Sequence, residues 1–260
     1  MPRGRPRAAI LTLLALAAML SGCTKMSGQL SPASNLNTAS TTPASADGVA
    51  ALGNKWKASP QDVGTGLAYA SGLESLGQKD EALDVYQKLS QSDPSNAKIA
   101  GLYGRKLVAA GSAEKAIPIL EGAEQQGETD WRLRSALGTA YDQQGLYQKA
   151  REQYQMVLAT DPQNLTVMNN LAMSYALEGN LKQAEAELRA ADALPRSKSE
   201  PRIRQNLALV VGLEGRFDEA TKLAQQDLPP EQVQQNMAYL KKMLSQPNTW
   251  QQISDGGKQG

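Results

Sequence analysis

Histidine is absent from this 260-residue chain, and cysteine occurs once, at Cys23. Without histidine the chain lacks the commonest general base and the commonest neutral metal ligand. One cysteine allows no internal disulfide and no thiolate metal cluster. Carboxylates, lysine and serine remain, so these absences lower the expectation of catalysis without excluding it. We predict a protein that is not an enzyme, with no cofactor, no metal and no small-molecule substrate.

Aromatic residues are also scarce, at 5% of the chain with a single phenylalanine. The large side chains that fill compact α/β cores are therefore few, whereas alanine, leucine, glutamine and glutamate, which favour helices, are plentiful. This composition predicts an all-α chain with small residues at its helix contacts. The 27 basic residues are balanced by 26 acidic ones. No concentrated positive excess exists to hold a phosphate backbone, so we expect no nucleic-acid partner.

The N-terminus has the pattern of a secretion signal. Three arginines are followed by the apolar run Ala8 to Leu20, whose 13 residues are too few for a membrane-spanning helix of ~20 residues. The sequence Leu20-Ser21-Gly22-Cys23 resembles the lipobox of bacterial lipoproteins. The resemblance implies that residues 1–22 are a signal peptide and that Cys23 carries acyl chains as a membrane anchor. An ordinary cleaved signal with an incidental cysteine is the alternative.

In the lipoproteins that this motif resembles, the residue after the cysteine influences sorting. Thr24, which stands where an aspartate would favour retention, implies the periplasmic face of the outer membrane rather than the inner membrane. Residues 23–50 are rich in serine, threonine, alanine and asparagine and predict a disordered tether. Val49, Leu52 and Trp56 fall at helical spacing and predict a short leading helix, which we place over 51–62, with Ser59 as the N-cap of the next helix. Residues 247–260 are expected to be a disordered tail.

A repeat of glycine followed five residues later by alanine runs through the rest of the chain. The glycines are separated by 34, 34, 34 and 36 residues, the period of tetratricopeptide helical hairpins. The pattern predicts an all-α solenoid, a right-handed superhelix of five repeats. The five pairs are Gly77 and Ala82, Gly111 and Ala116, Gly145 and Ala150, Gly179 and Ala184, and Gly215 and Ala220. The predicted units are 63–96, 97–130, 131–164, 165–198 and 201–234.

Each repeated residue has a mechanical role. The glycine ends the first helix of a hairpin in a left-handed conformation, and the alanine lets the two helices pack closely. After the repeats, residues 228–246 predict a C-terminal helix with Val233, Met237, Leu240 and Leu244 on one face. The end of a solenoid exposes a face that a terminal helix commonly covers. We therefore predict a capping helix, with an amphipathic partner-binding helix as the alternative.

Tetratricopeptide arrays bind partners mainly through the concave face formed by their first helices. By that family pattern, the candidate groove residues are Arg105, Val108, Arg132, Ser135, Thr139, Asp142, Asn169, Met173, Leu177, Arg202, Gln205, Leu209 and Leu213. The C-terminal half of this set is apolar. An exposed apolar stripe needs a cover, so Met173, Leu177, Leu209 and Leu213 are expected either to bind a partner's apolar segment or to lie under the C-terminal helix.

Two stretches near the C-terminus resemble a specific family. These are Arg202 to Leu213 with Gly215-Arg216, and Asp227 to Pro230 continuing through Asn236 to Leu244. Together with the lipobox and the repeats they resemble pilotin-like lipoproteins of type IV pili, and in particular the TadD family of the tight-adherence (Flp) pilus. The resemblance implies a scaffold for assembly of the pilus secretion apparatus, with an outer-membrane secretin as candidate partner. Two alternatives are a general periplasmic scaffold for envelope assembly and a subunit of a cell-wall hydrolase.

Overall fold

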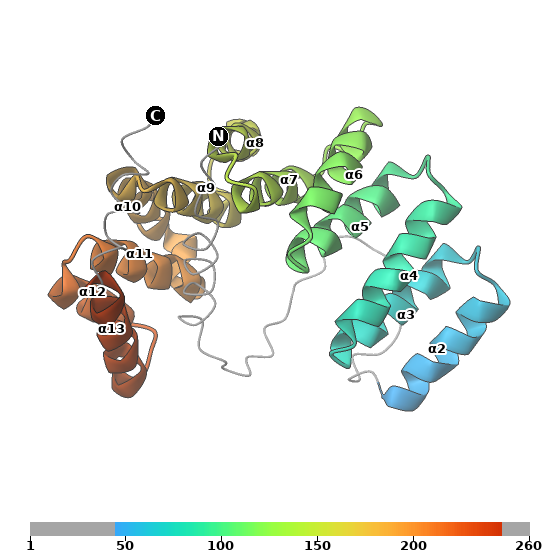
Figure 1. Cartoon of the computed structure of the whole chain (residues 1–260), viewed down its shortest axis with the longest axis horizontal. Coiled ribbons are helices and arrows are strands. Elements are labelled where there is room, and N and C mark those ends of the chain that lie inside the picture. The colour runs from blue at the N-terminus through green and yellow to red at the C-terminus, as the bar shows by residue number, and fades with distance from the viewer. Residues whose placement is uncertain (1–44, 246–260) are drawn as a thin grey trace, which may run out of the picture. The chain divides into compact units, whose positions relative to one another are not determined.

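The structure is a computed structural model that describes residues 45–245. Within that range the chain forms α-helices and one short 3-10 helix but no strand, as Figure 1 shows in colours from blue to red. The described residues divide into two compact units at Ala140 and Tyr141, inside helix α7 (Trp131–Gln143). The predicted signal peptide, the acylated Cys23, residues 23–44 of the tether and the tail 247–260 lie outside the described residues.

Paired helices make up most of both units. The first helices begin at residues 63, 97, 131, 165 and 201, where the predicted repeat units also begin. They are α3 (Val63–Ser75), α5 (Ala97–Ala109), α7, α9 (Leu165–Glu178) and α11 (Pro201–Leu213). Their second helices are α4 (Lys79–Ser92), α6 (Ala113–Gln125), α8 (Tyr147–Thr160), α10 (Leu181–Asp192) and α12 (Phe217–Ala224). The prediction of an all-α tandem array of helical hairpins is therefore confirmed.

The repeated glycines end first helices as the sequence predicts. Gly179 directly follows α9 with a φ of 94°. Its backbone amide donates hydrogen bonds to the carbonyls of Tyr175 and Ala176. The other four repeat glycines also have positive φ. Side chains rarely adopt this conformation, so glycine is favoured where the chain leaves the helix and turns toward the next one.

Small residues lie where paired helices approach most closely. The repeated alanines of the second helices are at most 1% exposed. In the first helix α5, a Cβ on Gly104 would lie 2.6 Å from Cγ of Leu120, which is fully buried in α6. Glycine at this position therefore allows a helix contact that even a methyl group would disturb.

The helix before the repeats starts earlier than the sequence predicted. Helix α2 spans Ala46–Ala58, so residues 46–50 are helical rather than part of the tether. The hydroxyl of Ser45 caps this helix by accepting a hydrogen bond from the amide of Gly48 at 3.1 Å. Val49 is 3% exposed, and its Cγ2 would be 2.8 Å from a Cβ on Gly72 of α3. Burial of one apolar side chain against a neighbouring glycine, together with the Ser45 cap and Asp47 in the first turn, thus extends the helix into the predicted tether.

The start of α3 also differs from the prediction. Ser59 follows α2 as its C-cap, and Asp62 is the residue that caps α3. The Asp62 carboxylate accepts hydrogen bonds from the Thr65 amide at 3.0 Å and from the Thr65 hydroxyl at 2.6 Å. A carboxylate at the helix N-terminus is favoured by both these bonds and the helix dipole.

Helix α13 (Pro230–Leu244) packs on the last hairpin, in the place predicted for a capping helix. Val233, Met237 and Leu240 are buried on its inner face, and Leu244 is partly buried. Leu240 lies over Gly212 of α11, so closely that no Cβ fits at that position. These side chains belong to one continuous core with α9, α10, α11 and α12.

Candidate functional site

The predicted groove residues all lie on the first helices of the hairpins. Arg105 and Val108 are on α5; Arg132, Ser135, Thr139 and Asp142 are on α7; Asn169, Met173 and Leu177 are on α9; and Arg202, Gln205, Leu209 and Leu213 are on α11. Their exposure and contacts differ widely, because some face solvent and others hold neighbouring helices together.

In the first unit, arginines dominate the accessible part of this set. Arg105 is half-buried, and this burial lowers the pKa of its guanidinium, against the opposing effect of the nearby Asp130 carboxylate. Arg132 is exposed, with its guanidinium 3.4 Å from Asp130 and 4.8 Å from the centre of the Trp131 ring. These two cations, rather than the apolar members, are the groups that a partner can reach.

Val108 and Ser135 of the same unit are core residues, at 6% and 7% exposed. They therefore present almost no surface, contrary to their placement among the groove residues. Thr139 is half-buried, and its hydroxyl donates a 2.9 Å hydrogen bond to the carbonyl of Ser135. Such a bond one turn earlier in the helix is a common intrahelical contact of threonine.

Asp142 is the least expected member, because its carboxylate is buried at 5% exposed. Tyr154 of α8 donates a 2.9 Å hydrogen bond to its Oδ2, and Ser174 of α9 donates a 2.6 Å bond to its Oδ1. Both donors are almost completely buried. The carboxylate therefore joins α7, α8 and α9 inside the second unit, and it is not open to a partner as the sequence suggested.

Burial raises the pKa of Asp142 to about 7, against the opposing effect of its two hydroxyl donors and of the cation Arg151. Arg151 itself is directed elsewhere, since its Nη1 lies 2.7 Å from Oε2 of Glu178 and its guanidinium lies over the Tyr175 ring. The negative charge of Glu178 adds to the rise in the pKa of Asp142. Asp142 is thus a buried acid that titrates near neutral pH.

Asn169 also lies inside the second unit. It is 4% exposed, and its Oδ1 accepts a 2.7 Å hydrogen bond from Nδ2 of Asn206, which is 7% exposed. The pair joins α9 to α11 across successive hairpins. A buried amide needs such a partner to offset the loss of its hydration. The asparagine pair is therefore part of the structural core rather than an open recognition group.

The apolar stripe divides into two parts. Met173 and Leu177 of α9 are partly buried and keep accessible surface. Leu209 and Leu213 of α11 are each 1% exposed and belong to the core that also contains Leu240 of α13. Of the two alternatives, burial in the core that α13 helps to form therefore holds for Leu209 and Leu213, whereas Met173 and Leu177 still have surface that a partner can reach.

Arg202 is exposed and Gln205 is half-buried, so both remain accessible on α11. Between them, Arg204 forms a contact that sequence reasoning missed. Its guanidinium donates to both carboxylate oxygens of Asp227, at 2.6 and 2.8 Å, and only 11% and 8% of the two side chains are exposed. In the sequence, Asp227 stands where the repeat pattern usually has a small apolar residue. This departure was the one sign in the sequence of the bidentate ion pair.

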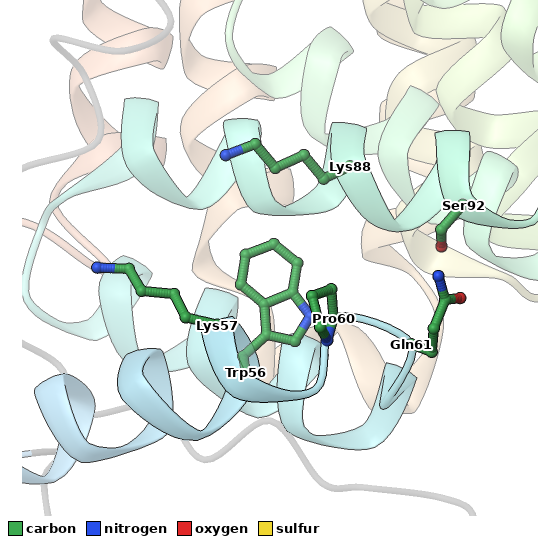
Figure 2. A pocket seen from close by; sticks show the side chains of 6 residues that line it. All are labelled: Trp56, Lys57, Pro60, Gln61, Lys88 and Ser92. Carbon is green, nitrogen blue, oxygen red and sulfur yellow. The ribbon is translucent and has the colours of Figure 1, made fainter.

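A pocket of about 330 Å³ lies outside the predicted groove, in the first unit (Figure 2). It is lined by the end of α2, the turn that follows and the last turns of α4. The lining side chains are Trp56, Lys57, Pro60, Gln61, Lys88 and Ser92. In Figure 2 the indole of Trp56 lies between the two lysines, with Gln61 and Ser92 at the opposite end of the pocket.

Trp56 is held in place by close contacts with α3. It is 7% exposed, its ring centre lies 6.1 Å from that of Tyr69, and its Nε1 would be 2.8 Å from a Cβ on Gly66. That nitrogen has no hydrogen-bond partner among the described residues. The indole therefore forms a fixed aromatic wall of the pocket, positioned by a glycine on the neighbouring helix.

Two further properties of the described residues concern ligands and membranes. Between residues 45 and 245, no group of three or more acidic, histidine or cysteine side chains is arranged to hold a metal ion. Over the same range, every helix is too short or too polar to cross a bilayer.

Sequence comparison finds a similarity in the central repeats. Two models of the tetratricopeptide repeat match the chain, over residues 67–130 and 107–172. No curated protein matches the chain.

Several solved structures share the fold. A tetratricopeptide repeat protein from Parabacteroides merdae has a TM-score of 0.60 at 13% identity, over 75% of this chain and 77% of that one. PilW, described as a widely conserved type IV pilus biogenesis factor, has a TM-score of 0.56 at 18% identity, over 80% and 89%. YrrB, described as a TPR protein with an unusual peptide-binding site, has a TM-score of 0.52 at 19% identity, over 75% and 99%. At such identities the likeness is one of fold. Residues 67–172 therefore match models of the tetratricopeptide repeat, and the described chain has the all-α fold of a tetratricopeptide-repeat solenoid.

Proposed function

We propose that this protein is a membrane-anchored scaffold for assembly of the Flp-type pilus secretion apparatus, and that it acts by binding other proteins. Tetratricopeptide repeats indicate a protein–protein interaction scaffold. The observation that supports a role in pilus assembly is the likeness to the pilus biogenesis factor PilW, which extends over 80% of this chain. The resemblance of residues 201–250 to the TadD family supports the Flp system in particular.

The proposal includes a lipid anchor at Cys23 and a place on the periplasmic face of the outer membrane. It is supported by the signal pattern of residues 1–22 and by Thr24 after the cysteine. Two acyl chains suffice for lasting attachment, whereas one alone does not. Metabolic labelling with palmitate tests the anchor, because Cys23→Ser should lose the label and move the protein into the soluble periplasmic fraction.

The proposal assigns no catalytic step to this chain. Each compact unit has its own candidate binding surface, made of the predicted groove residues that keep accessible surface. They are Arg105, Arg132, Thr139, Met173, Leu177, Arg202 and Gln205. Arginine and methionine are well suited to such surfaces, since one forms bidentate bonds to carboxylates and the other adapts its shape to apolar partners.

A site-specific cross-linking experiment tests the function. A photoreactive side chain is introduced at Arg132 or Arg202, and at the exposed position Lys115 as a control, in the acylated protein in its own membrane. Cross-links to the pilus secretin from the two candidate positions, and none from Lys115, are expected. Cross-links to a different envelope complex instead would contradict the pilus role and favour a general periplasmic scaffold.

A further inference from the structure

The pocket around Trp56 lies on a different part of the molecule from the predicted groove. The groove residues all come from first helices, whereas the pocket is built by α2, the turn after it and the second helix α4. Its volume of about 330 Å³ is at the lower end of the range for ligand pockets and is large enough for one or two side chains of a partner.

The pocket has a distinct chemical character. Its wall is the indole of Trp56 with the ring of Pro60, which together provide an apolar surface. Two lysines, Lys57 and Lys88, border the indole, while Gln61 at the other end offers both hydrogen-bond donors and an acceptor. An apolar wall beside two cations suits an apolar group that is followed closely by a negative charge.

Neither lysine takes part in an ion pair among the described residues. Neither ammonium has a carboxylate within 4.0 Å among residues 45–245. Lys57 lies in the last turn of α2, where a cation is favoured by the helix dipole, but α4 has no basic residue in its last turn. Lys88 therefore has neither an ion-pair partner nor a helix terminus to account for its position beside the indole.

We propose that this pocket binds an acidic peptide segment of a partner protein, with an apolar side chain against Trp56 and Pro60 and a flanking carboxylate between Lys57 and Lys88. The inference deepens the proposed scaffold function by giving the chemistry of one partner segment. A bilayer surface suits the site less well. Membrane-surface binding relies on exposed aromatic groups that enter the lipid and on larger basic clusters, whereas Trp56 is 7% exposed and lies in the wall of a concave pocket.

The test uses the chain from Thr24 to Gly260, labelled with nitrogen-15, and a set of short capped peptides. Each peptide carries one leucine, isoleucine or phenylalanine between two glutamates, and the matched peptides carry two lysines instead. The three tryptophans of the chain give separate indole signals, so Trp56 is followed directly by NMR. We expect each acidic peptide to shift the Trp56 indole signal more than its lysine counterpart does. The shift should saturate at millimolar peptide concentration.

Matched variants separate a charge effect from a fold effect. Lys57→Gln combined with Lys88→Gln should weaken binding of the acidic peptides ~10-fold, or about 1.4 kcal/mol, because two exposed charge contacts are lost. Lys98→Gln combined with Lys115→Gln removes the same charge from other exposed positions and should leave the affinity unchanged. Circular dichroism of all variants should match the unmodified chain, since all four lysines are exposed.

Three results would overturn the inference. The first is an unmoved Trp56 signal with all acidic peptides, and the second is equal affinity of both double variants. The third is a shift of the Trp56 signal with phosphatidylglycerol vesicles but not with peptides, which disappears in the Lys57→Gln and Lys88→Gln variant. That result would assign the site to a membrane surface. Failure here stays distinct from failure of the pilus role, because the secretin cross-links are formed from Arg132 and Arg202, outside this pocket.

Discussion

Tyr154 donates a hydrogen bond of 2.9 Å to Asp142, which lies twelve residues earlier in the chain. In the first hairpin Tyr86 donates a hydrogen bond of 3.4 Å to Glu74, with the same spacing of twelve residues. Each tyrosine lies on a second helix, and each acid lies near the end of the first helix of the same hairpin. The repeat therefore carries a polar tie between its two helices as well as its pattern of small residues.

The next hairpin contributes the residue that distinguishes the two sites. The residue 32 positions after Glu74 is Lys106, whose ammonium lies 2.5 Å from the carboxylate. The residue 32 positions after Asp142 is Ser174, whose hydroxyl donates at 2.6 Å. Glu74, which is only partly buried, is therefore paired with a cation, while the buried Asp142 accepts hydrogen bonds from two neutral hydroxyl groups. Neutral donors stabilise a buried negative charge less than a cation does.

Replacement of Asp142 by asparagine should change how stability depends on pH. The pKa of Asp142 rises from 3.8 to about 7 on burial, so between these values the folded protein keeps a proton that the unfolded chain has released. The free energy of unfolding contributed by this group is fully present below pH 3.8 and is lost as the pH rises through about 7, a loss on the order of 4 kcal/mol. Asp142→Asn, which stays neutral, should be less sensitive to pH and more stable than the unmodified chain above neutral pH.

Urea denaturation at pH 5 and pH 8 measures this difference. Asp218→Asn, on an exposed position of α12, serves as the control for loss of a surface carboxylate and should follow the unmodified chain. A pH dependence of Asp142→Asn equal to that of the control would show that Asp142 is charged in the folded protein at both values.

Two glycine-to-alanine substitutions in one hairpin should have opposite effects. Gly104→Ala places a methyl group 2.6 Å from Cγ of Leu120, and overpacking of this kind costs roughly 1–3 kcal/mol. Gly122→Ala meets nothing within 4 Å on α6, and should stabilise the helix by up to about 1 kcal/mol. Thermal unfolding followed by circular dichroism tests both. A higher melting temperature for Gly104→Ala would contradict the close helix contact.

The sequence predicts such contacts well because a helix pair needs a small residue at the same place in every repeat. It predicts the buried polar residues poorly. Asp142 falls on a groove position of the family pattern, and its burial depends on Tyr154 and Ser174, which come from two later helices. The start of α2 was placed at residue 51 rather than 46 for a related reason. The helical spacing of Val49 with Leu52 and Trp56 was visible in the sequence, but the contact of Val49 with Gly72 of the next helix was not. Contacts between different helices decided both cases, and local composition carries little information about them.

The ion pair of Arg204 and Asp227 gives a further test. Asp227→Ala leaves the largely buried guanidinium of Arg204 with only the longer contact to Asp192, at 3.7 Å, so this variant should cost about 3 kcal/mol. Arg204→Met combined with Asp227→Leu removes both charges and should recover most of that loss, since an apolar pair of similar volume often replaces a buried ion pair at little cost. Chemical denaturation of the two single variants and the double variant gives the coupling free energy directly. A double variant less stable than Asp227→Ala would contradict the pairing.

The two parts of the apolar stripe should respond differently to a new charge. Leu209 is 1% exposed, so Leu209→Asp buries a carboxylate without a partner and should cost more than about 4 kcal/mol, enough to unfold much of the last hairpin. Leu177 is partly buried at the surface of α9, and Leu177→Asp should keep the helical spectrum while it weakens cross-linking to the partner. Leu209→Met, which conserves volume, should cost less than about 1.5 kcal/mol and retain binding. An unchanged melting temperature for Leu209→Asp would mean that α13 leaves this part of α11 open in solution, and the stripe would then be a binding surface along its whole length.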